Sequence, residues 1–405
     1  MSDSTANTPD ARKPEPLDHF VSQAPFDAQA ATLLTPEQEK YYLSSQWRLM
    51  WLKFRRHKLA LWSGIYLILV YASILISEVI APYSFTHRHT DFIYAPPQEV
   101  RLFHDGSFIG PYVYPYDVKL NMEELRWDYT EDTSNPQKLR FLCTSDDYAG
   151  STYEFWGLFE SNFHLVCPAA GGQFFFLGTD RLGRDIQSRI IQGARISLTV
   201  GLIGVTISFV LGITLGGMAG YFGGMVDWCV QRVIEVIRSF PSLPLWMALS
   251  AAMPVNWSPI VVFLGITVIL GLLDWPGLAR AVRSKLLALR EEDFAVAAQL
   301  MGATPTRIIG KHLLPSFTSY IIVDLVISFP YMVLSETALS FIGLGLKDPV
   351  NSLGVMLQNV TSADVLLNYQ WYFIPVIFFI ALVMAFVFVG DGLRDAADPY
   401  SDNNK

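Results

Sequence analysis

The stretch WYFIPVIFFIALVMAFVFV, from Trp371 to Val389, contains no charged residue. A helix needs about 20 mainly apolar residues to cross the hydrocarbon core of a bilayer, which is roughly 30 Å thick. An uncharged stretch of this length therefore predicts a membrane-spanning helix. It places the chain among integral membrane proteins.

Other apolar stretches of similar length precede it, namely 59–80, 196–219, 226–253, 260–278 and 320–339. The chain of 405 residues is 51% hydrophobic and 16% charged, and its mean hydropathy is +0.31. This composition is too apolar for a soluble protein of this size. We therefore predict an all-α polytopic membrane protein with about six transmembrane helices. The stretch 226–253 holds several charges and two prolines, so we expect its crossing to begin near Ile234.

Basic residues gather beside the predicted spans and indicate their orientation. A basic collar from Lys53 to Lys58 precedes the first span, and several Lys and Arg residues lie between Arg280 and Lys311. Cytoplasmic loops carry the excess of these residues, so we predict that the N and C termini are cytoplasmic. The net charge is −8, and nothing in its distribution indicates a nucleic-acid partner.

The segment between the first two spans is unusually long for a loop. Its aromatic residues, short apolar runs and turn residues predict a small folded domain with mixed or β-rich structure on the periplasmic side. The predicted division is a disordered cytoplasmic tail 1–34, an interfacial amphipathic helix 35–58, a first span 59–80, a periplasmic loop domain 81–176, an outer amphipathic segment 177–195, a five-helix core 196–395 and a cytoplasmic tail 396–405.

Two of the three cysteines, Cys143 and Cys167, fall within this outer domain. Disulfides persist in an oxidising periplasm, so we predict a bond between them. A loop of this length would gain roughly 3 kcal/mol in the chain-entropy model. The alternative is two buried free thiols. No cysteine spacing indicates a metal site.

The segment AVAAQLMGATPTRIIGKHLLPSF, from Ala295 to Phe317, lies in the predicted cytoplasmic connection. It resembles the signature of ABC importer permeases, which is Glu-Ala-Ala, three residues, Gly, nine residues, an apolar residue, one residue and Leu-Pro. Val296 replaces the Glu and His312 the apolar residue. The pattern also predicts two short helices over 291–316, separated at Gly302 and restarted by Thr304 and Pro305.

Three further segments resemble the dipeptide/oligopeptide/nickel permease family. They are LGTDRLGRD from Leu177 to Asp185, SETALSFIGLG from Ser335 to Gly345, and GDGLRD from Gly390 to Asp395 with Asp398-Pro399. The resemblance covers roughly 174–400. It implies a multi-pass permease of the bacterial inner membrane that forms half of a path for oligopeptides or similar small solutes.

The resemblance also implies partners. These are a second homologous permease, two cytoplasmic ATPase subunits and a periplasmic solute-binding protein. The chain has no GxxxxGK[ST] phosphate-binding loop. ATP and Mg are therefore expected on the partner ATPases, with no cofactor, no metal and no enzymatic activity in this chain.

The candidate site residues form two groups. The predicted ATPase-coupling residues are Ala297, Ala298, Gly302, Thr304, Arg307, Leu314 and Pro315. The second group lies in the outer segment and consists of Gly178, Thr179, Asp180, Gly183, Arg184 and Asp185. These residues either contact a binding protein or a gate, or hold the segment in place by local ion pairs. Glu336 joins this group because an intramembrane carboxylate is a functional-site hypothesis. It is either a gate contact or a structural polar link.

Two other functions compete with the importer permease. A self-sufficient secondary carrier needs a membrane-centred ion site, usually with repeated halves, and the sequence shows neither. A membrane-bound enzyme would use the outer domain, which contains several histidines, but their spacing indicates no metal centre and no nucleophile motif is present. The importer permease is therefore the preferred hypothesis.

Overall fold

The computed structural model describes residues 46–123, 126–144, 147–254, 256–348 and 350–397. The chain divides into a short unit, Met1–Leu49, and a large unit, Met50–Lys405, which is the subject here. The predicted tail 1–34, the first part of the predicted interfacial helix (35–45) and residues 398–405 of the predicted C-terminal tail lie outside the described residues. The remainder of that helix is α2 (Gln46–Arg56).

Five apolar helical segments of the described chain are long enough to cross a membrane. They are α3 (Lys58–Leu75), α5 (Ile186–Phe222), the pair α8 (Pro259–Asp274) and α9 (Pro276–Leu289), α13 (Thr318–Phe341), and the pair η2 (Gln370–Phe373) and α16 (Ile374–Ala397). The main core lies where α3, α5, α13 and α16 meet, with Leu198, Val333 and Leu382 fully enclosed. The helical membrane fold is thereby confirmed.

Glycines allow α5 and α9 to approach closely. A Cβ added at Gly216 would lie 2.5 Å from the carbonyl oxygen of Ala279, and one at Gly220 would lie 2.8 Å from that of Arg283. Helices in lipid associate through close packing rather than a hydrophobic driving force. Larger residues at either position would therefore separate the two helices.

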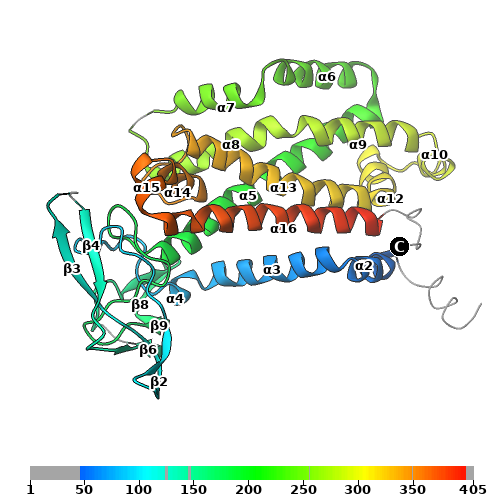
Figure 1. Cartoon of the computed structure of the whole chain (residues 1–405). Coiled ribbons are helices and arrows are strands. Elements are labelled where there is room, and N and C mark those ends of the chain that lie inside the picture. Colours follow the sequence, from blue (N-terminus) through cyan, green and yellow to red (C-terminus); the bar gives the residue numbers. More distant parts are fainter. Residues whose placement is uncertain (1–45, 124–125, 145–146, 255, 349, 398–405) are drawn as a thin grey trace, which may run out of the picture. The chain divides into compact units, whose positions relative to one another are not determined.

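The predicted span 226–253 is wrong as a single helix. The structure has α6 (Gly224–Ser239) and α7 (Ser242–Ala251), separated at Phe240 and Pro241. Phe240 is extended, with φ −96° and ψ 140°, as expected for a residue before proline. Together α6 and α7 lead the chain back along one side of the bundle (Figure 1). This broken pair takes the place of the sixth predicted span.

Short elements lie at both ends of the bundle (Figure 1). At the end with α2 are α10 (Asp293–Leu300), α11 (Pro305–Ile308), the π-helical turn η1 (Ile309–Leu313) and α12 (Leu314–Ser316). At the opposite end are α4 (Ser77–Ile80), the strands, α14 (Leu353–Val360) and α15 (Ala363–Asn368). The predicted basic collar and the predicted coupling helices thus share one end.

The segment that the sequence predicts to be a loop domain contains nine short strands. Its strands are β1 (Arg101–His104), β2 (Ser107–Val113), β3 (Tyr116–Asn121), β4 (Arg126–Glu131), β5 (Gln137–Lys138), β6 (Arg140–Thr144), β7 (Tyr153–Phe155), β8 (Phe159–Ser161) and β9 (Phe163–Cys167). They pair antiparallel in the orders β1-β2-β5, β3-β4, β6-β9 and β7-β8. Cys143 of β6 and Cys167 of β9 form a disulfide with a Cα–Cα distance of 6.5 Å.

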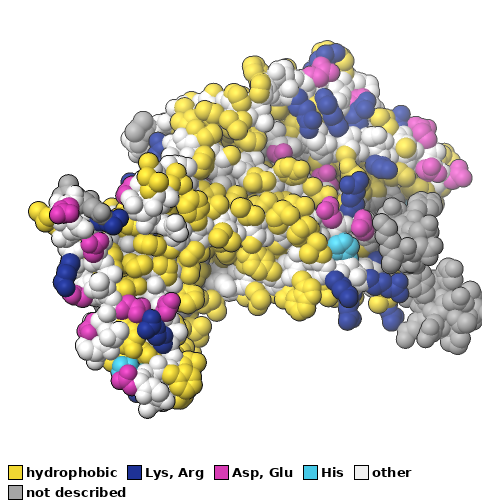
Figure 2. Space-filling model, in the orientation of Figure 1, with side chains coloured by type: hydrophobic (Ala, Val, Ile, Leu, Met, Phe, Trp, Pro, Cys, Tyr) yellow, Lys and Arg dark blue, Asp and Glu magenta, His cyan; other side chains and the backbone are white. Residues whose placement is uncertain are grey.

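Side-chain types are segregated along the large unit. Hydrophobic side chains cover the middle of the face that Figure 2 shows, over α3 and α16. Charged side chains gather toward the end with α2 and on the strands. An apolar band between two charged regions is the distribution that a bilayer requires of a helical bundle.

Candidate functional site

In the predicted coupling segment, 291–316, a sharp turn joins α10 to α11, which continues into η1 and α12. Gly302 follows α10 with φ +80°, a left-handed conformation that glycine adopts without steric cost. Its N–H donates to the carbonyl of Gln299 at 2.9 Å, and that of Ala303 donates to Ala298 at 3.1 Å. Thr304 then takes the N-cap position and Pro305 the first position of α11, although the Thr304 hydroxyl makes no capping bond.

One face of α10 packs against the rest of the bundle, and the opposite face is exposed. Ala298 is buried with Ile308 and Leu313 in a small core against α9. Leu300 and Met301 are each 82% exposed. Among the other predicted coupling residues, Ala297, Gly302, Thr304, Arg307 and Pro315 are exposed and Leu314 is half-buried. The segment therefore presents an apolar surface, supported by a packed base, to whatever lies beyond it.

The predicted outer segment is largely buried, and it contacts the loop that precedes β1. Gly178 and Gly183 have φ of +80° and +70°. A Cβ at Gly183 would lie 2.0 Å from the carbonyl oxygen of His89, and one at Gly178 would lie 2.6 Å from that of Ala95. The Thr179 hydroxyl accepts the N–H of Ala95 at 2.7 Å. These residues hold the segment in place.

Asp180 is the centre of a buried ionic cluster. Its carboxylate accepts the N–H of Arg184 at 2.8 Å, the Nε of Arg184 at 2.7 Å and an Nη of Arg189 at 2.6 Å. Arg189 also donates to Asn351 at 2.7 Å, and Asn351 returns a bond of 2.6 Å to the Arg189 carbonyl. Arg184 donates to Asp348 at 3.0 Å. The cluster joins the start of α5 to the loop before α14.

The pKa values of two carboxylates in this region are shifted from their ordinary values. Asp185 caps α5 by accepting the N–H and hydroxyl of Ser188 at 2.7 and 2.6 Å. Its complete burial raises its pKa to about 6, against the lowering effect of these bonds. Burial alone would also raise the pKa of Asp348, but the hydrogen bond and charge of Arg184, with the charge of Arg189, lower it.

Glu336 of α13 is fully buried. Its carboxylate accepts the hydroxyls of Ser197 and Ser340, each at 2.8 Å. The same Ser197 hydroxyl accepts the N–H of Leu353 at 3.2 Å. Glu336 therefore links α5, α13 and the start of α14, an arrangement that favours the structural polar link over the gate contact.

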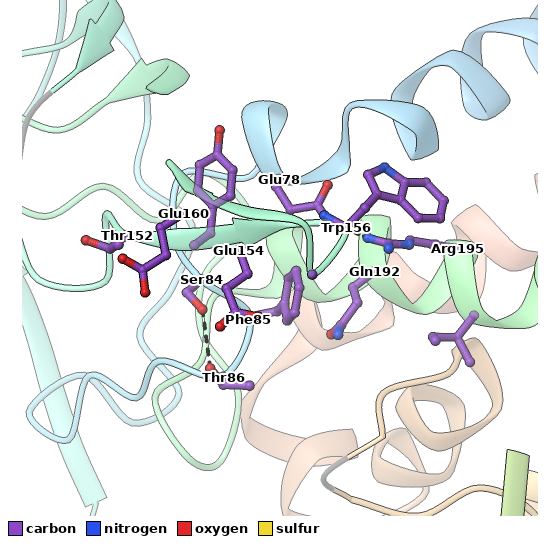
Figure 3. Close-up of a pocket in the computed structure, with 13 residues that line it drawn as sticks. Glu78, Ser84, Phe85, Thr86, Thr152, Glu154, Trp156, Glu160, Gln192 and Arg195 are labelled. Carbon is purple, nitrogen blue, oxygen red and sulfur yellow. Dashed lines mark hydrogen bonds and ion pairs between the residues drawn. The ribbon is translucent and has the colours of Figure 1, made fainter. Parts of the chain in front are cut away.

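A cavity of about 550 Å³ lies between the strands and the start of α5 (Figure 3). The Arg195 guanidinium lies 3.6 Å from the centre of the Trp156 ring and pairs with the buried Glu78. The Trp156 indole donates to the carbonyl of Leu75 at 3.1 Å. Glu154 and Glu160 face each other across β7 and β8. The cavity contains none of the predicted site residues and marks the joint between the strand domain and the first span.

Comparison with known proteins places the chain in a family. Residues 212–401 match the family model for the binding-protein-dependent transport system inner membrane component. Residues 45–97 match that for the N-terminal TM domain of oligopeptide transport permease C. A dipeptide transport system permease protein DppC of Bacillus subtilis is 40% identical over 233 residues, which are 57% of this chain and 70% of the relative. The chain belongs to this family of inner membrane components.

Two further relatives, an OppC and a second DppC, agree with this assignment. An oligopeptide transport system permease protein OppC of Haemophilus influenzae is 37% identical over 59% of this chain and 74% of the relative. A dipeptide transport system permease protein DppC of Lactococcus lactis is 38% identical over 56% of this chain and 64% of the relative, so the match spans less than two thirds of that protein. A chain of the MetNI methionine ABC transporter shows a TM-score of 0.40 at 20% identity, covering 51% of this chain and 95% of that one.

Membership confirms the predicted family and the predicted location. The chain is a multi-pass component of the bacterial inner membrane. The predicted resemblance over 174–400 agrees with the matched region 212–401, and the match over 45–97 adds the first span. The strands over 101–167 fall between the two matches.

Sequence reasoning missed the residues that complete the ionic cluster. Arg189 lies within a predicted amphipathic segment, and its side chain is fully buried. Asn351 and Asp348 are distant from it in sequence and were not singled out. The one available signal was an arginine at the start of an apolar helix, which in a membrane protein faces a partner or the bundle interior.

Proposed function

We propose that the chain is one transmembrane permease subunit of an ATP-driven importer. It forms half of the path by which oligopeptides or similar small solutes, delivered by a periplasmic binding protein, enter the cytoplasm. The relatives DppC and OppC, permease proteins of dipeptide and oligopeptide transport systems, support this substrate class. The observation that carries the proposal is the apolar face of the coupling segment, which is exposed on a packed base at the basic end of the bundle.

The proposed assembly contains a second homologous permease, two ATPase subunits below and a binding protein above. ATP and Mg bind the ATPase subunits. The coupling segment supplies no nucleotide-binding group of its own but offers Leu300 and Met301 to a partner's cleft. A conformational change of the ATPases would reach the bundle through Ala298, Ile308 and Leu313, which pack against α9.

The proposed orientation has both termini in the cytoplasm and the strand domain in the periplasm. The Lys53–Lys58 collar lies at the same end as the coupling helices, and the strands lie at the other. The positive-inside rule places the collar in the cytoplasm. The Cys143–Cys167 disulfide agrees with an oxidising compartment for the strands.

Single cysteines test this orientation. In a Cys229→Ser background, Ser107→Cys at the exposed start of β2 is expected to react with a membrane-impermeant maleimide in intact cells. Ser2→Cys is expected to react only after the membrane is permeabilised. Labelling of Ser2→Cys from outside, with protection of Ser107→Cys, would reverse the orientation.

The function itself is tested by purification and reconstitution. The tagged chain is expected to co-purify with the second permease and the ATPase subunits. Proteoliposomes of the complex are expected to take up trialanine only with ATP and the binding protein. Uptake by this chain alone, driven by an ion gradient without ATP, would instead establish the secondary carrier.

A further inference from the structure

Polar residues form a stripe along one face of the apolar helix α13. Asp324, Ser328, Tyr331 and Ser335 are spaced by alternating steps of four and three residues, so they share one face of a helix. The stripe extends over roughly 16 Å at 1.5 Å per residue. A polar stripe of this length in a membrane span would be costly against lipid and therefore faces water or protein.

Two cavities open along this stripe. One, of about 110 Å³, is lined by Ser208, Asp324 and Ser328. The other, of about 420 Å³, is lined by Trp246 of α7 and by Tyr331 and Ser335. The two cavities share Arg238 and Asp274, so these two charged residues stand at the boundary between them.

Arg238 and Asp274 are opposite charges that are not closed into a tight pair. Asp274 lies near the middle of the span Pro259–Leu289, interacts electrostatically with Arg238 and accepts a hydroxyl of Ser208 at 3.4 Å. No salt bridge joins the two residues in the described part of the chain. Both side chains are exposed within the isolated subunit.

The backbone beside them makes room for the guanidinium. A Cβ added at Gly277 would lie 3.1 Å from Nη2 of Arg238. A third cavity, of about 430 Å³, lies beyond the outer end of α7, where Ser250, Leu344 and Lys347 line it. The side of the bundle that carries α7 thus holds hollows at the outer end and within the span.

We propose that this face lines the translocation path and that Arg238 and Asp274 bind the charged ends of a zwitterionic cargo. The guanidinium binds a terminal carboxylate, and the carboxylate binds a terminal ammonium group. A charge at mid-span is tolerated in a water-filled cavity, and a separated pair can exchange weak mutual attraction for direct bonds to a cargo. The inference rests on the proposed function and names the cargo contacts within it.

Derivatives of one tripeptide provide the test. Uptake of trialanine, N-acetyl-trialanine and trialanine amide is measured in proteoliposomes of the full complex, and each variant's rate is divided by the wild-type rate for the same probe. Preferences of the binding protein then cancel. Arg238→Gln is expected to lower uptake of the two probes with a free carboxylate by about tenfold, with little effect on the amide. Asp274→Asn is expected to affect the two probes with a free amine.

Arg232→Gln on the same helix is the matched control, because Arg232 is exposed and pairs with Glu235 outside both cavities. Equal losses for all three probes, or none, would overturn the assignment of cargo contacts. Failure of the wild type to transport any probe would count against the proposed function instead.

Cysteine accessibility tests the path without any cargo. In the Cys229→Ser background, Ser328→Cys and Ser335→Cys are expected to react with cationic and anionic methanethiosulfonate reagents in the assembled complex. Ile68→Cys, on the exposed apolar face of α3, is expected to be inert in the bilayer. Stripe cysteines as unreactive as Ile68→Cys would exclude a water-filled path along α13, whatever the transport assay shows.

Discussion

Gly302→Trp is expected to weaken strongly the stimulation of ATP hydrolysis by loaded binding protein while the helix bundle stays folded. No atom lies within 4 Å of a Cβ built at Gly302, so an indole there projects outward beside the exposed Leu300 and Met301. It would hold an ATPase subunit away from this apolar face. A weakening of about 1.4 kcal/mol lowers affinity tenfold, and we expect stimulation in the reconstituted complex to fall by about tenfold or more.

Gly302→Asn separates bulk from backbone strain. The backbone at Gly302 has φ +80°, which asparagine tolerates better than other side chains, and its side chain is short. Near wild-type stimulation is expected. Normal stimulation in Gly302→Trp would show that this turn does not contact the ATPase, and equal losses in both variants would assign the effect to the backbone.

The membrane fold was readable from the sequence because burial in lipid demands long apolar runs. The stretch 371–389 lies within the predicted and observed last span. The second helix begins at Ile186, ten residues before the predicted start at 196, and it therefore includes Arg189 and Arg195. Their charges are satisfied by Asp180 and Glu78 inside the folded chain.

Local turn chemistry was also predictable, whereas tertiary partners were not. Gly302 and Pro305 mark the break and restart of the coupling helices in the sequence and in the structure. Pro241 was visible too, yet the apolar residues on both sides of it favoured one continuous span. Pairings such as Arg189 with Asn351 depend on how α5 docks beside the loop before α14. Single-sequence periodicity carries no information on that docking.

The proposed path contacts were the least predictable from the sequence. Asp324 taken alone is a single carboxylate within the predicted span 320–339. Its meaning changes once Ser328, Tyr331 and Ser335 are placed on the same face and beside two cavities. Arg238 and Asp274 come from different helices, so only the packed bundle brings them to one boundary.

Asp180→Asn is expected to destabilise the subunit by about 3–5 kcal/mol, the cost of breaking a buried ion pair. The replacement is nearly isosteric and keeps an oxygen for the N–H groups of Leu182 and Arg184, which Asp180 accepts at 2.8 Å each. It removes the charge and the second oxygen, Oδ2, which accepts from the Nε of Arg184 and an Nη of Arg189. Arg189, which is fully buried, then loses its closest counter-charge.

Thermal unfolding of the purified complex measures this effect. We expect the midpoint to fall by roughly 10 °C. The matched control is Asp117→Asn, because Asp117 forms an ion pair of 2.9 Å with Lys119 in which both side chains are exposed. A surface pair of this kind contributes about 0–1 kcal/mol, so the control should unfold close to the wild-type temperature.

The double variant Asp180→Asn with Arg189→Met decides whether charge or packing dominates. Methionine fills much of the arginine volume but carries no charge. Arg189→Met therefore removes the buried charge that Asp180→Asn leaves without a partner. The double variant should therefore be more stable than the sum of the two single losses predicts. Two outcomes would show that the charges of the cluster do not hold α5 against the loop before α14. One is an unfolding temperature of Asp180→Asn equal to that of Asp117→Asn, and the other is a loss of stability in the double variant equal to the sum of the two single losses. The outer segment would then owe its position to the close backbone contacts of Gly178 and Gly183.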